Sequence, residues 1–511
     1  MKQKNILEYL EDTVQKLPDQ VAYTDGTKAL TFQEVFDQAQ AIGTYLHLHN
    51  HQNEPVVVFM KRSPESIAAF FGCVYAGCFY IPLDEEMPKA RMELIIQNVS
   101  PRGLICDVDT KKALENYSYQ GEVYCYEEII ETKVDQTALS AIRERQIDTD
   151  PIYIVFTSGS TGIPKGVTAC HRSVIDYIEA LSEILQASSK TIFGNQVPLY
   201  FDACLKELLC TIKHGGTTYL IPKSLFMFPI KLVEYLNQYQ INTLCWVSSA
   251  LTMISGLGVL KKMVPKYLHT VAFGSEVFPV KQFNLWREAL LHARFINLYG
   301  PTECTGMSCY YVVDEVLDLE DTIPIGRPFP NRDVFLLGED NQKVTNNEVG
   351  EICIRGTSLT LGYYKNFEKT TESFVQNPLN TCYPELIYKT GDLGRYNDRK
   401  DLVFVSRKDN QIKHMGHRIE LGEIELHTNK VDGVSTSCCL YDQQKGKIVL
   451  CYMGQADKKQ ILFSLKEKLP RYMLPNKIIS LERMPFMANG KIDRVHLKEE
   501  HIDNLENGGK N

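Results

Sequence analysis

The sequence predicts an α/β protein with a large N-terminal body, in which mixed, largely parallel sheets are covered by helices, and a small α+β C-terminal domain. Short apolar runs recur at residues 56–59, 80–81, 104–105 and 153–156, as in strands buried on both faces. Helical spacing separates them, as in the apolar positions of 174–185. Strands and helices that alternate in this way favour parallel sheets between layers of helices.

The amino-acid composition of the chain changes near residue 392, where turn-forming and charged residues become frequent. Beyond this stretch we expect strands at 437–441 and 448–453 and a helix at 459–469. A chain of 511 residues exceeds one ordinary core. We therefore expect an N-terminal domain at 1–408, a small domain at 409–498 and a flexible tail at 499–511, which lacks apolar periodicity.

Composition excludes several classes of function. The formal net charge of -8 offers no basic excess for nucleic acid, and no apolar run is long enough for membrane insertion. Acidic residues near the N-terminus interrupt the place where a signal peptide would be apolar. The fifteen cysteines form no CxxC pair, which favours reduced, buried thiols in a cytoplasmic protein.

The loop TSGSTGIPKG at 157–166 follows a predicted strand and combines hydroxyls, glycines and a lysine. A P-loop of the GxxxxGK[ST] type needs glycine before the lysine, where this chain has Pro164, and a hydroxyl after it, where it has Gly166. Proline has no N–H to donate to phosphate. The remaining hydroxyls and glycines can still present donors to an anion, and the alternative for the isolated loop is a surface turn.

Further motifs follow in a fixed order along the chain. They are FDA at 201–203, NLYGPTE at 297–303, YKTGD at 388–392, SRKDNQIKHMGHRIELGEIE at 406–425 and NGKIDR at 489–494. With the loop at 157–166, they make the chain resemble the adenylate-forming superfamily of acyl- and aminoacyl-AMP synthetases, which includes the adenylation domains of nonribosomal peptide synthetases. The resemblance runs over nearly the whole chain.

The resemblance implies a reaction of a carboxylate with ATP that gives an acyl adenylate and pyrophosphate, with Mg²⁺ as cofactor. It assigns catalytic roles to Thr302, which contacts the α-phosphate, to Glu303, which holds Mg²⁺, and to Lys491, which bridges the carboxylate and the α-phosphate. It also implies that the small domain is mobile and rotates about a hinge at Asp409.

The same resemblance implies a set of nucleotide-binding residues. In it Tyr299 stacks on adenine, Asp392 accepts hydrogen bonds from the ribose hydroxyls, and Arg407 assists there. The loop clamps the phosphates that leave as pyrophosphate. The full set is Thr157, Ser158, Gly159, Ser160, Thr161, Gly162, Lys165, Asn297, Tyr299, Gly300, Asp392 and Arg407.

Asp202 is the main argument for an amino acid substrate. In the amino-acid-activating branch the aspartate at this position pairs with the α-ammonium, whereas acyl and aryl acids would leave a buried carboxylate unpaired. The alternative for Asp202 is an N-cap of the helix that follows. The implied substrate residues are Phe201, Asp202, Ala203, Lys206, Cys245, Val271, Phe273, Leu298, Gly306 and Met307.

Most of these positions are apolar and favour a small or medium uncharged side chain. Lys206 departs from this pattern: lysine usually extends its ammonium to solvent, so we expect it to point outward, whereas an inward lysine invites an acidic or polar side chain.

In length and in the segments WVSSALTMI at 246–254 and FGSEVFPVKQF at 273–283, the chain is similar to the free-standing D-alanine–carrier protein ligases. It departs from them at FGSE, where that group has Phe-Cys-Gly-Glu, and at FDA, where that group has FDL. These departures reshape the pocket and weigh against D-alanine.

No carrier module follows residue 491, so a carrier protein bearing phosphopantetheine is expected to act in trans. An acyl- or aryl-CoA ligase, with coenzyme A as acceptor, is one alternative. A non-catalytic nucleotide-binding partner of a synthetase is another. The sequence names neither the amino acid and its chirality nor the carrier.

Overall fold

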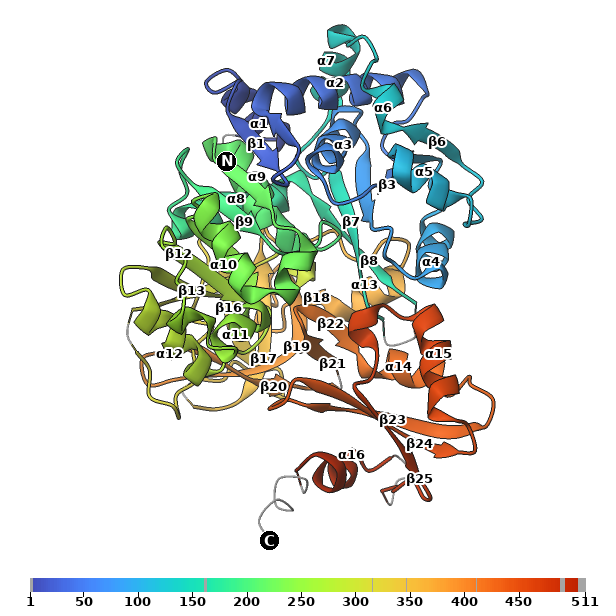
Figure 1. The fold of residues 1–511 in the computed structure, drawn as a ribbon, viewed down its shortest axis with the longest axis vertical. Coiled ribbons are helices and arrows are strands. Elements are labelled where there is room, and N and C mark those ends of the chain that lie inside the picture. Colours follow the sequence, from blue (N-terminus) through green and yellow to red (C-terminus); the bar gives the residue numbers. More distant parts are fainter. Residues whose placement is uncertain are drawn as a thin grey trace. The chain divides into compact units, whose positions relative to one another are not determined.

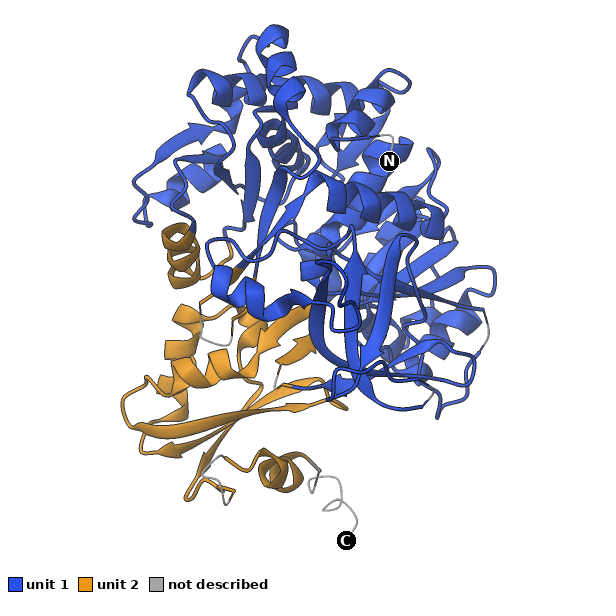
Figure 2. Ribbon diagram, turned by 180° about the vertical axis from the view of Figure 1, so that it is seen from behind, with its two compact units in different colours: residues 1–85, 99–156, 166–408 blue, residues 86–98, 157–165, 409–511 orange. Residues whose placement is uncertain are grey.

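The structure is a computed structural model that describes residues 3–159, 163–314, 316–345, 347–409, 411–487 and 492–503. The chain divides into two compact units (Figure 2). Unit 1 comprises residues 1–85, 99–156 and 166–408, and unit 2 comprises residues 86–98, 157–165 and 409–511. Unit 2 therefore gathers two upstream segments, including most of the TSGSTGIPKG loop, together with the C-terminal part of the chain.

A long mixed sheet of unit 1 has the strand order β15-β14-β13-β12-β11-β9-β10-β1-β2 (Figure 1). Neighbours from β13 to β1 pair in parallel, and the pairs at both edges are antiparallel. The strands are β1 (Val21–Thr24), β2 (Ala29–Thr31), β9 (Ile192–Asn195), β10 (Thr217–Leu220), β11 (Thr243–Val247), β12 (Thr270–Gly274), β13 (Arg294–Tyr299), β14 (Cys309–Val313) and β15 (Arg327–Pro328).

A second sheet, in the order β6-β5-β3-β4-β7-β8, contains the apolar runs from which the parallel strands were predicted. The pairs β3–β4, β3–β5, β4–β7 and β5–β6 are parallel, and β3 is buried at every position, as expected for a strand covered on both faces. The strands are β3 (Pro55–Phe59), β4 (Phe79–Leu83), β5 (Gly103–Cys106), β6 (Glu122–Cys125), β7 (Pro151–Thr157) and β8 (Lys165–Cys170).

A third sheet of unit 1 is antiparallel and was not distinguished in the sequence. Its order is β16-β17-β19-β18, with β20 paired to β19. The strands are β16 (Arg332–Leu337), β17 (Gly350–Gly356), β18 (Phe374–Gln376), β19 (Leu386–Tyr396) and β20 (Leu402–Arg407). Asp392 and Arg407 are cross-strand partners in it, so the sheet brings the YKTGD and SRKD motifs together.

The helices of unit 1 begin at recognisable signals. Thr31 and Glu34 form a capping box for α2, and Ser63 caps α3 just before a proline. The helices are α1 (Leu7–Val14), α2 (Phe32–Leu48), α3 (Pro64–Tyr75), α5 (Val108–Leu114), α6 (Tyr126–Ile129), α7 (Gln136–Arg145), α8 (His171–Leu185), α9 (Leu205–His214), α10 (Pro229–Gln238), α11 (Ser248–Gly256), α12 (Val280–Ala289) and α13 (Phe367–Ser373), with 3₁₀ turns η1 (Asp202–Cys204), η2 (Lys223–Met227), η3 (Val259–Lys261) and η4 (Thr302–Cys304).

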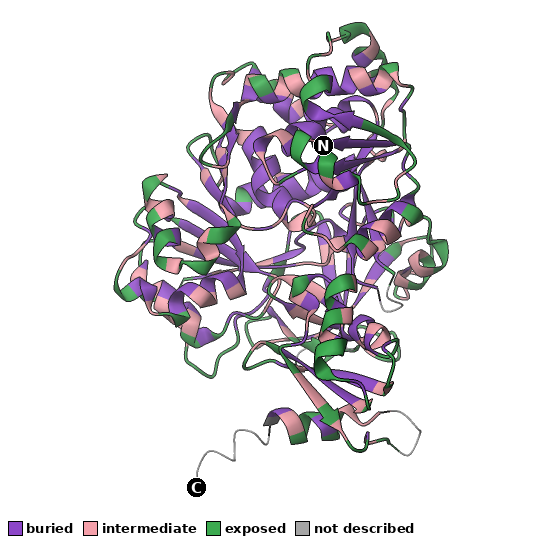
Figure 3. Ribbon diagram, turned by 45° about the vertical axis from the view of Figure 1, so that its right-hand side comes forward, coloured by how far each residue is buried: buried purple, intermediate pink, exposed green. Residues whose placement is uncertain are grey.

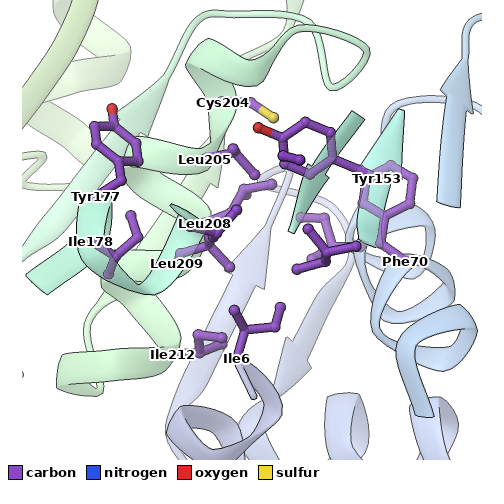
Figure 4. Close-up of a cluster of buried hydrophobic side chains, with 14 of the residues drawn as sticks. Ile6, Phe70, Tyr153, Tyr177, Ile178, Cys204, Leu205, Leu208, Leu209 and Ile212 are labelled. Atoms are coloured by element: carbon purple, nitrogen blue, oxygen red, sulfur yellow. The ribbon is translucent and has the colours of Figure 1, made fainter. Parts of the chain in front are cut away.

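One core cluster of unit 1 lies where α8 and α9 cover strands. Buried residues fill the strands and the inward faces of the helices (Figure 3). In the close-up, α9 contributes Leu205, Leu208, Leu209 and Ile212 to one apolar cluster (Figure 4). This packing fixes the first turn of α9, which follows directly on the FDA motif.

Unit 2 contains the predicted strands and helix of the small domain. The strands β23 and β24 are antiparallel and β24 pairs in parallel with β25. The elements are α4 (Lys89–Val99), β21 (Gln411–His414), β22 (His417–Glu420), α14 (Leu421–Thr428), β23 (Val434–Asp442), β24 (Lys447–Gly454), α15 (Lys458–Lys468), η5 (Arg471–Met473), β25 (Lys477–Leu481), α16 (Arg494–Lys498) and the π-helical turn η6 (Glu499–Asp503).

An upstream segment is tied into unit 2 by a buried ion pair. The Arg91 guanidinium on α4 lies 3.0 Å from the Glu423 carboxylate on α14, and both side chains are buried. Residues 499–503, which the sequence assigned to the tail, form η6, and Ile502 packs in a cluster with Leu497.

The predicted fold class is confirmed: parallel sheets between helices in a large body, and a smaller α+β unit. All the cysteines lie in the described part of the chain, unpaired and, apart from Cys382, buried. None of the helices that the structure describes has the length and apolar character needed to cross a lipid bilayer.

Candidate active site

Asp202 lies beside the YGPTE segment. Burial raises the pKa of its carboxyl, while the positive charge of Lys206 and hydrogen bonding with the Thr302 side chain and the Gly306 backbone lower it. The nearby carboxylate of Glu303 raises it further, so the net direction is upward. A cation that binds next to this carboxyl stabilises its charged form and lowers its pKa.

The N-cap alternative for Asp202 is wrong. Asp202 is the first residue of η1, whose N-cap is Phe201, and the N-cap of α9 is Cys204. Neither cap position makes a side-chain capping hydrogen bond. The aspartate carboxylate is thus available to the space near Thr302 and is not needed to start the helix.

Glu303 is fully buried in η4 and held by two residues of the same unit. Its Oε1 accepts a hydrogen bond from the Tyr363 hydroxyl at 2.7 Å, and its carbonyl accepts one from the Thr360 hydroxyl at 2.9 Å. In the described part of the chain no group of three or more His, Cys, Asp or Glu residues is arranged to hold a metal. A cation here would combine Glu303 with oxygens of a substrate, which suits Mg²⁺.

Tyr299 and Asp392, which are buried, form a cluster with the half-buried Arg407. The Tyr299 hydroxyl donates to Asp392 Oδ2 at 2.6 Å, and Arg407 Nη1 donates to Asp392 Oδ1 at 2.5 Å. Each carboxylate oxygen thus has a protein donor and retains further acceptor capacity. Asn297 donates from its side-chain amide to the Pro324 carbonyl at 2.8 Å, so its amide supports the backbone near this cluster.

Two glycines let the YGPTECTG segment fold back on itself. A Cβ at Gly300 would lie 2.2 Å from the Gly306 carbonyl oxygen, and one at Gly306, where φ is +74°, would lie 2.7 Å from the Tyr177 ring. Only glycine fits these positions without displacing neighbours. The segment can therefore present Thr302 and Glu303 on the same side as Asp202.

The described part of the phosphate loop contains a buried orphan hydroxyl. Thr157, at the end of β7, is buried and its Oγ1 has no hydrogen-bond partner among the described residues. Such a group fits an anion as its missing partner. Within unit 2 the Ser158 hydroxyl donates to the Arg418 carbonyl at 2.8 Å. Gly159 is buried and Lys165 begins β8.

Several predicted residues lie outside the described ranges: Ser160, Thr161, Gly162 and the catalytic candidate Lys491. The hinge candidate Asp409 is exposed, and its Oδ1 accepts a hydrogen bond from the Gln411 backbone N–H at 3.2 Å, as in an Asx-turn. The boundary between the two units falls between Lys408 and Asp409.

A small pocket in unit 1 collects part of the predicted substrate set. It is lined by Lys206, Cys245, Trp246, Val247, Ala272, Phe273, Gly274, Ser275, Leu298 and Met307. The expectation that Lys206 extends to solvent is wrong: the residue is only 4% exposed and lines the pocket. The cause is its position in the first turn of α9, which is buried on both sides of it at Leu205 and Glu207.

The assignment of Val271 to the pocket is also corrected. Side chains alternate along β12, and Ala272 shares a cluster with Cys245 and Leu298, whereas Val271 belongs to the cluster on the other face. The Phe273 ring likewise packs on that other face, although the residue borders the pocket. Sequence reasoning missed Ala272, and the two-residue period of the strand was the signal that could have found it.

The other predicted substrate positions lie elsewhere. Phe201 and Ala203 are half-buried, and the Phe201 ring lies 4.6 Å from that of Tyr200. Among the described residues that line the pocket neither Ala203 nor Gly306 occurs, but Gly306 contacts Asp202 through its backbone.

Comparison with known proteins gives consistent matches. The family model of the AMP-binding enzymes matches residues 10–364. The chain is 30% identical over 515 residues to the D-alanine--D-alanyl carrier protein ligase of Bacillus licheniformis, covering 97% of this chain and 99% of that one. It is also 28% identical over 502 residues to tyrocidine synthase 1 of Brevibacillus parabrevis, covering 97% of this chain. The chain spans only 45% of the length of that synthase.

The fold has solved counterparts. The structure of holo-PA1221, described as an NRPS protein containing adenylation and PCP domains, superposes with a TM-score of 0.82 at 23% identity, over 97% of this chain and 84% of that one. This likeness shows the fold. Taken with the family match and the ligase that is matched over 99% of its length, it leads to one conclusion: the chain belongs to the family of AMP-binding enzymes.

Proposed function

We propose that the protein is an AMP-forming ligase for an amino acid. In the first step the substrate carboxylate attacks the α-phosphorus of ATP, an O–P bond forms, and the bond to pyrophosphate breaks. In the second step the thiolate of a carrier protein's phosphopantetheine attacks the acyl carbon, and AMP leaves. The thiol proton passes to solvent.

The observation that carries this proposal is the position of Asp202. Its carboxyl lies among Thr302, Glu303 and Gly306. A carboxylate that can bind an α-ammonium is therefore next to the YGPTE segment, which we propose contacts the phosphates. An ammonium bound there places the neighbouring substrate carboxylate next to Thr302. Positioning of this kind converts a bimolecular attack into a step between held groups.

The nucleotide would be held by the chain's own polar groups. Asp392, oriented by Tyr299 and Arg407, has acceptor capacity left for the ribose hydroxyls. The unpartnered Thr157 hydroxyl suits a phosphate oxygen. Lys491 is proposed to bridge the substrate carboxylate and the α-phosphate, a role that removes charge repulsion between two anions.

Mg²⁺ fits Glu303, whose buried carboxylate prefers a hard cation shared with phosphate oxygens, and when bound it would neutralise phosphate charge. We further propose that residues 409–498 form the mobile small domain that brings Lys491 to the site, with Asp409 as hinge. The names of the similar proteins, a D-alanyl carrier protein ligase and an adenylation–PCP protein, support a carrier protein as the acceptor.

Amino-acid-dependent exchange of labelled pyrophosphate into ATP tests the proposal. Exchange with amino acids and not with simple acids supports it, whereas exchange only with acids that lack an amino group indicates an acyl- or aryl-CoA ligase. ATP binding without any exchange indicates a non-catalytic partner. The Lys491→Ala variant is expected to lose adenylate formation while ATP binding persists, and equal loss of both would contradict its role.

A further inference from the structure

The pocket beside Asp202 carries a buried cation. Lys206 is 4% exposed and lines the pocket together with apolar or small residues such as Cys245, Ala272 and Leu298. A buried ammonium is costly unless an anion or several acceptors surround it. The side chains that line the pocket include no carboxylate, so an anionic partner of Lys206 lies outside this lining or enters with a ligand.

The carboxylates near Lys206 do not pair with it directly. No ion pair or hydrogen bond of the Lys206 ammonium is found among the described residues, and its nitrogen is not one of the fully enclosed side-chain atoms left without a partner there. Its charge nevertheless lowers the pKa of both Asp202 and Glu207, which places it within electrostatic range of both. Lys206 therefore shares two carboxyls without being held by either.

Glu207 offers incomplete neutralisation. It is fully buried, and burial raises the pKa of its carboxyl to about 7, although the Lys206 charge, its own backbone N–H and the Asn195 side chain lower that pKa. Near neutral pH this carboxyl is therefore only partly ionised. Arg62 also lies within electrostatic range of Glu207 and competes with Lys206 for the negative charge of that carboxylate.

Substrate binding shifts this balance further. The proposed function requires that the α-ammonium of the amino acid pairs with Asp202. The Asp202 carboxylate then no longer compensates the charge of Lys206. An amino acid with a neutral side chain would leave the Lys206 charge with the partly ionised Glu207 alone. A substrate with a side-chain carboxylate brings a negative charge into the pocket, and this charge can pair with the Lys206 ammonium.

We propose that the pocket selects an α-amino acid whose side chain ends in a carboxylate, aspartate or glutamate, and that Lys206 is the residue that pairs with this carboxylate. This inference rests on the proposed function. The small apolar walls contact the side-chain methylenes, and Lys206 distinguishes the acid from its amide.

Pyrophosphate exchange with matched acid and amide pairs tests the inference. Aspartate is compared with asparagine, and glutamate with glutamine, each as L- and D-isomers, with alanine and leucine as neutral references. A charged hydrogen bond contributes about 1.5–3 kcal/mol, so we expect one acid to exceed its amide by roughly 10- to 150-fold in kcat/KM.

The decisive variant is Lys206→Met, which keeps the length of the side chain and removes its charge. It should bring the preferred acid and its amide to within a few-fold of each other, while exchange with the amide persists. Lys213→Met is the matched control: Lys213 lies on the same helix but pairs with Glu179 at 2.9 Å, so the preference for the acid should stay unchanged.

Glu207→Gln separates pairing with substrate from a purely structural role of Lys206. If Lys206 serves the substrate, the preference for the acid is kept or increased once this competing carboxyl is neutral. If Lys206 serves only Glu207, the preference is absent in the wild type. This comparison also decides the matter should Lys206→Met fail to fold.

The outcomes distinguish the two levels of proposal. A wild-type protein that prefers alanine, leucine or an amide overturns the acidic pocket but leaves amino acid activation standing. Exchange with no amino acid overturns the proposed function itself. A preference for the acid that survives Lys206→Met would show that another group recognises the carboxylate, which also contradicts the inference.

Discussion

Asp202→Asn is the sharpest test of amino acid recognition. Asparagine has nearly the same shape and can accept from the Thr302 side chain and the Gly306 backbone, which adjoin the aspartate. The substitution therefore removes the charge and little else, which a change to alanine would not achieve.

The expected loss follows from the burial of the pair. Asp202 is itself half-buried and the pKa of its carboxyl is raised, so a bound ammonium completes a buried pair, and the removal of one partner from such a pair costs about 3–5 kcal/mol. At 1.36 kcal/mol for each factor of ten, kcat/KM for the amino acid should fall roughly 150- to 5,000-fold. The KM for ATP should change by only a few-fold.

The assay is pyrophosphate exchange across pH. Below the raised pKa of Asp202 the wild-type carboxyl is protonated and cannot pair with an ammonium, so kcat/KM for the amino acid should fall as the pH drops through that value. The asparagine variant should lack this acidic limb. An Asp202→Asn protein that keeps its kcat/KM to within about five-fold would refute a charge pair with the substrate.

Three further predictions concern the frame of the site. Tyr299→Phe removes a donor to the Asp392 carboxylate, and a hydrogen bond to a charged group contributes about 1.5–3 kcal/mol, so the KM for ATP should rise at least ten-fold while that for the amino acid stays constant. Gly306→Ala should lower the thermal midpoint and the exchange rate more than Gly258→Ala: both glycines have positive φ, but only the first has a ring within 3 Å of the new Cβ; equal effects would contradict the steric argument. Glu207→Gln should raise the thermal midpoint most above about pH 7. The pKa of this acid rises from 4.5 to about 7 on folding, so its ionised form destabilises the folded state by roughly 3 kcal/mol, and this cost disappears as the pH falls toward 4.5. An equal shift of the midpoint at every pH would contradict the assignment.

The sequence was informative where a pattern is local. Apolar runs predicted β3, β4, β5 and β7 of the second sheet but not β6 and β8, and helical spacing predicted α8, because these signals depend on burial that repeats along a few residues. The antiparallel sheet of β16 to β20 was not distinguished, although most of its pairings join strands that are neighbours in sequence, because its strands lack a shared pattern of burial.

The pocket shows the same limit at the level of single residues. The motif placed Asp202 correctly next to the YGPTE segment. On β12, however, Val271 was predicted to line the pocket and Ala272 does so, because an error of one residue on a strand selects the opposite face. The burial of Lys206 could not be read from its type, since lysine on a helix normally extends to water and only the packing of α9 prevents it.

Unit 2 has a consequence for protein engineering. Because it is assembled from three separate stretches of chain, a chimera made by exchanging residues 409–511 alone would leave behind the Arg91 that neutralises the buried Glu423. A buried carboxylate without its partner costs about 3–5 kcal/mol, enough to unsettle a small domain. An exchange of this unit between AMP-binding enzymes should therefore carry α4 and the loop at 157–165 along with the C-terminal residues, because the unit is discontinuous in the gene.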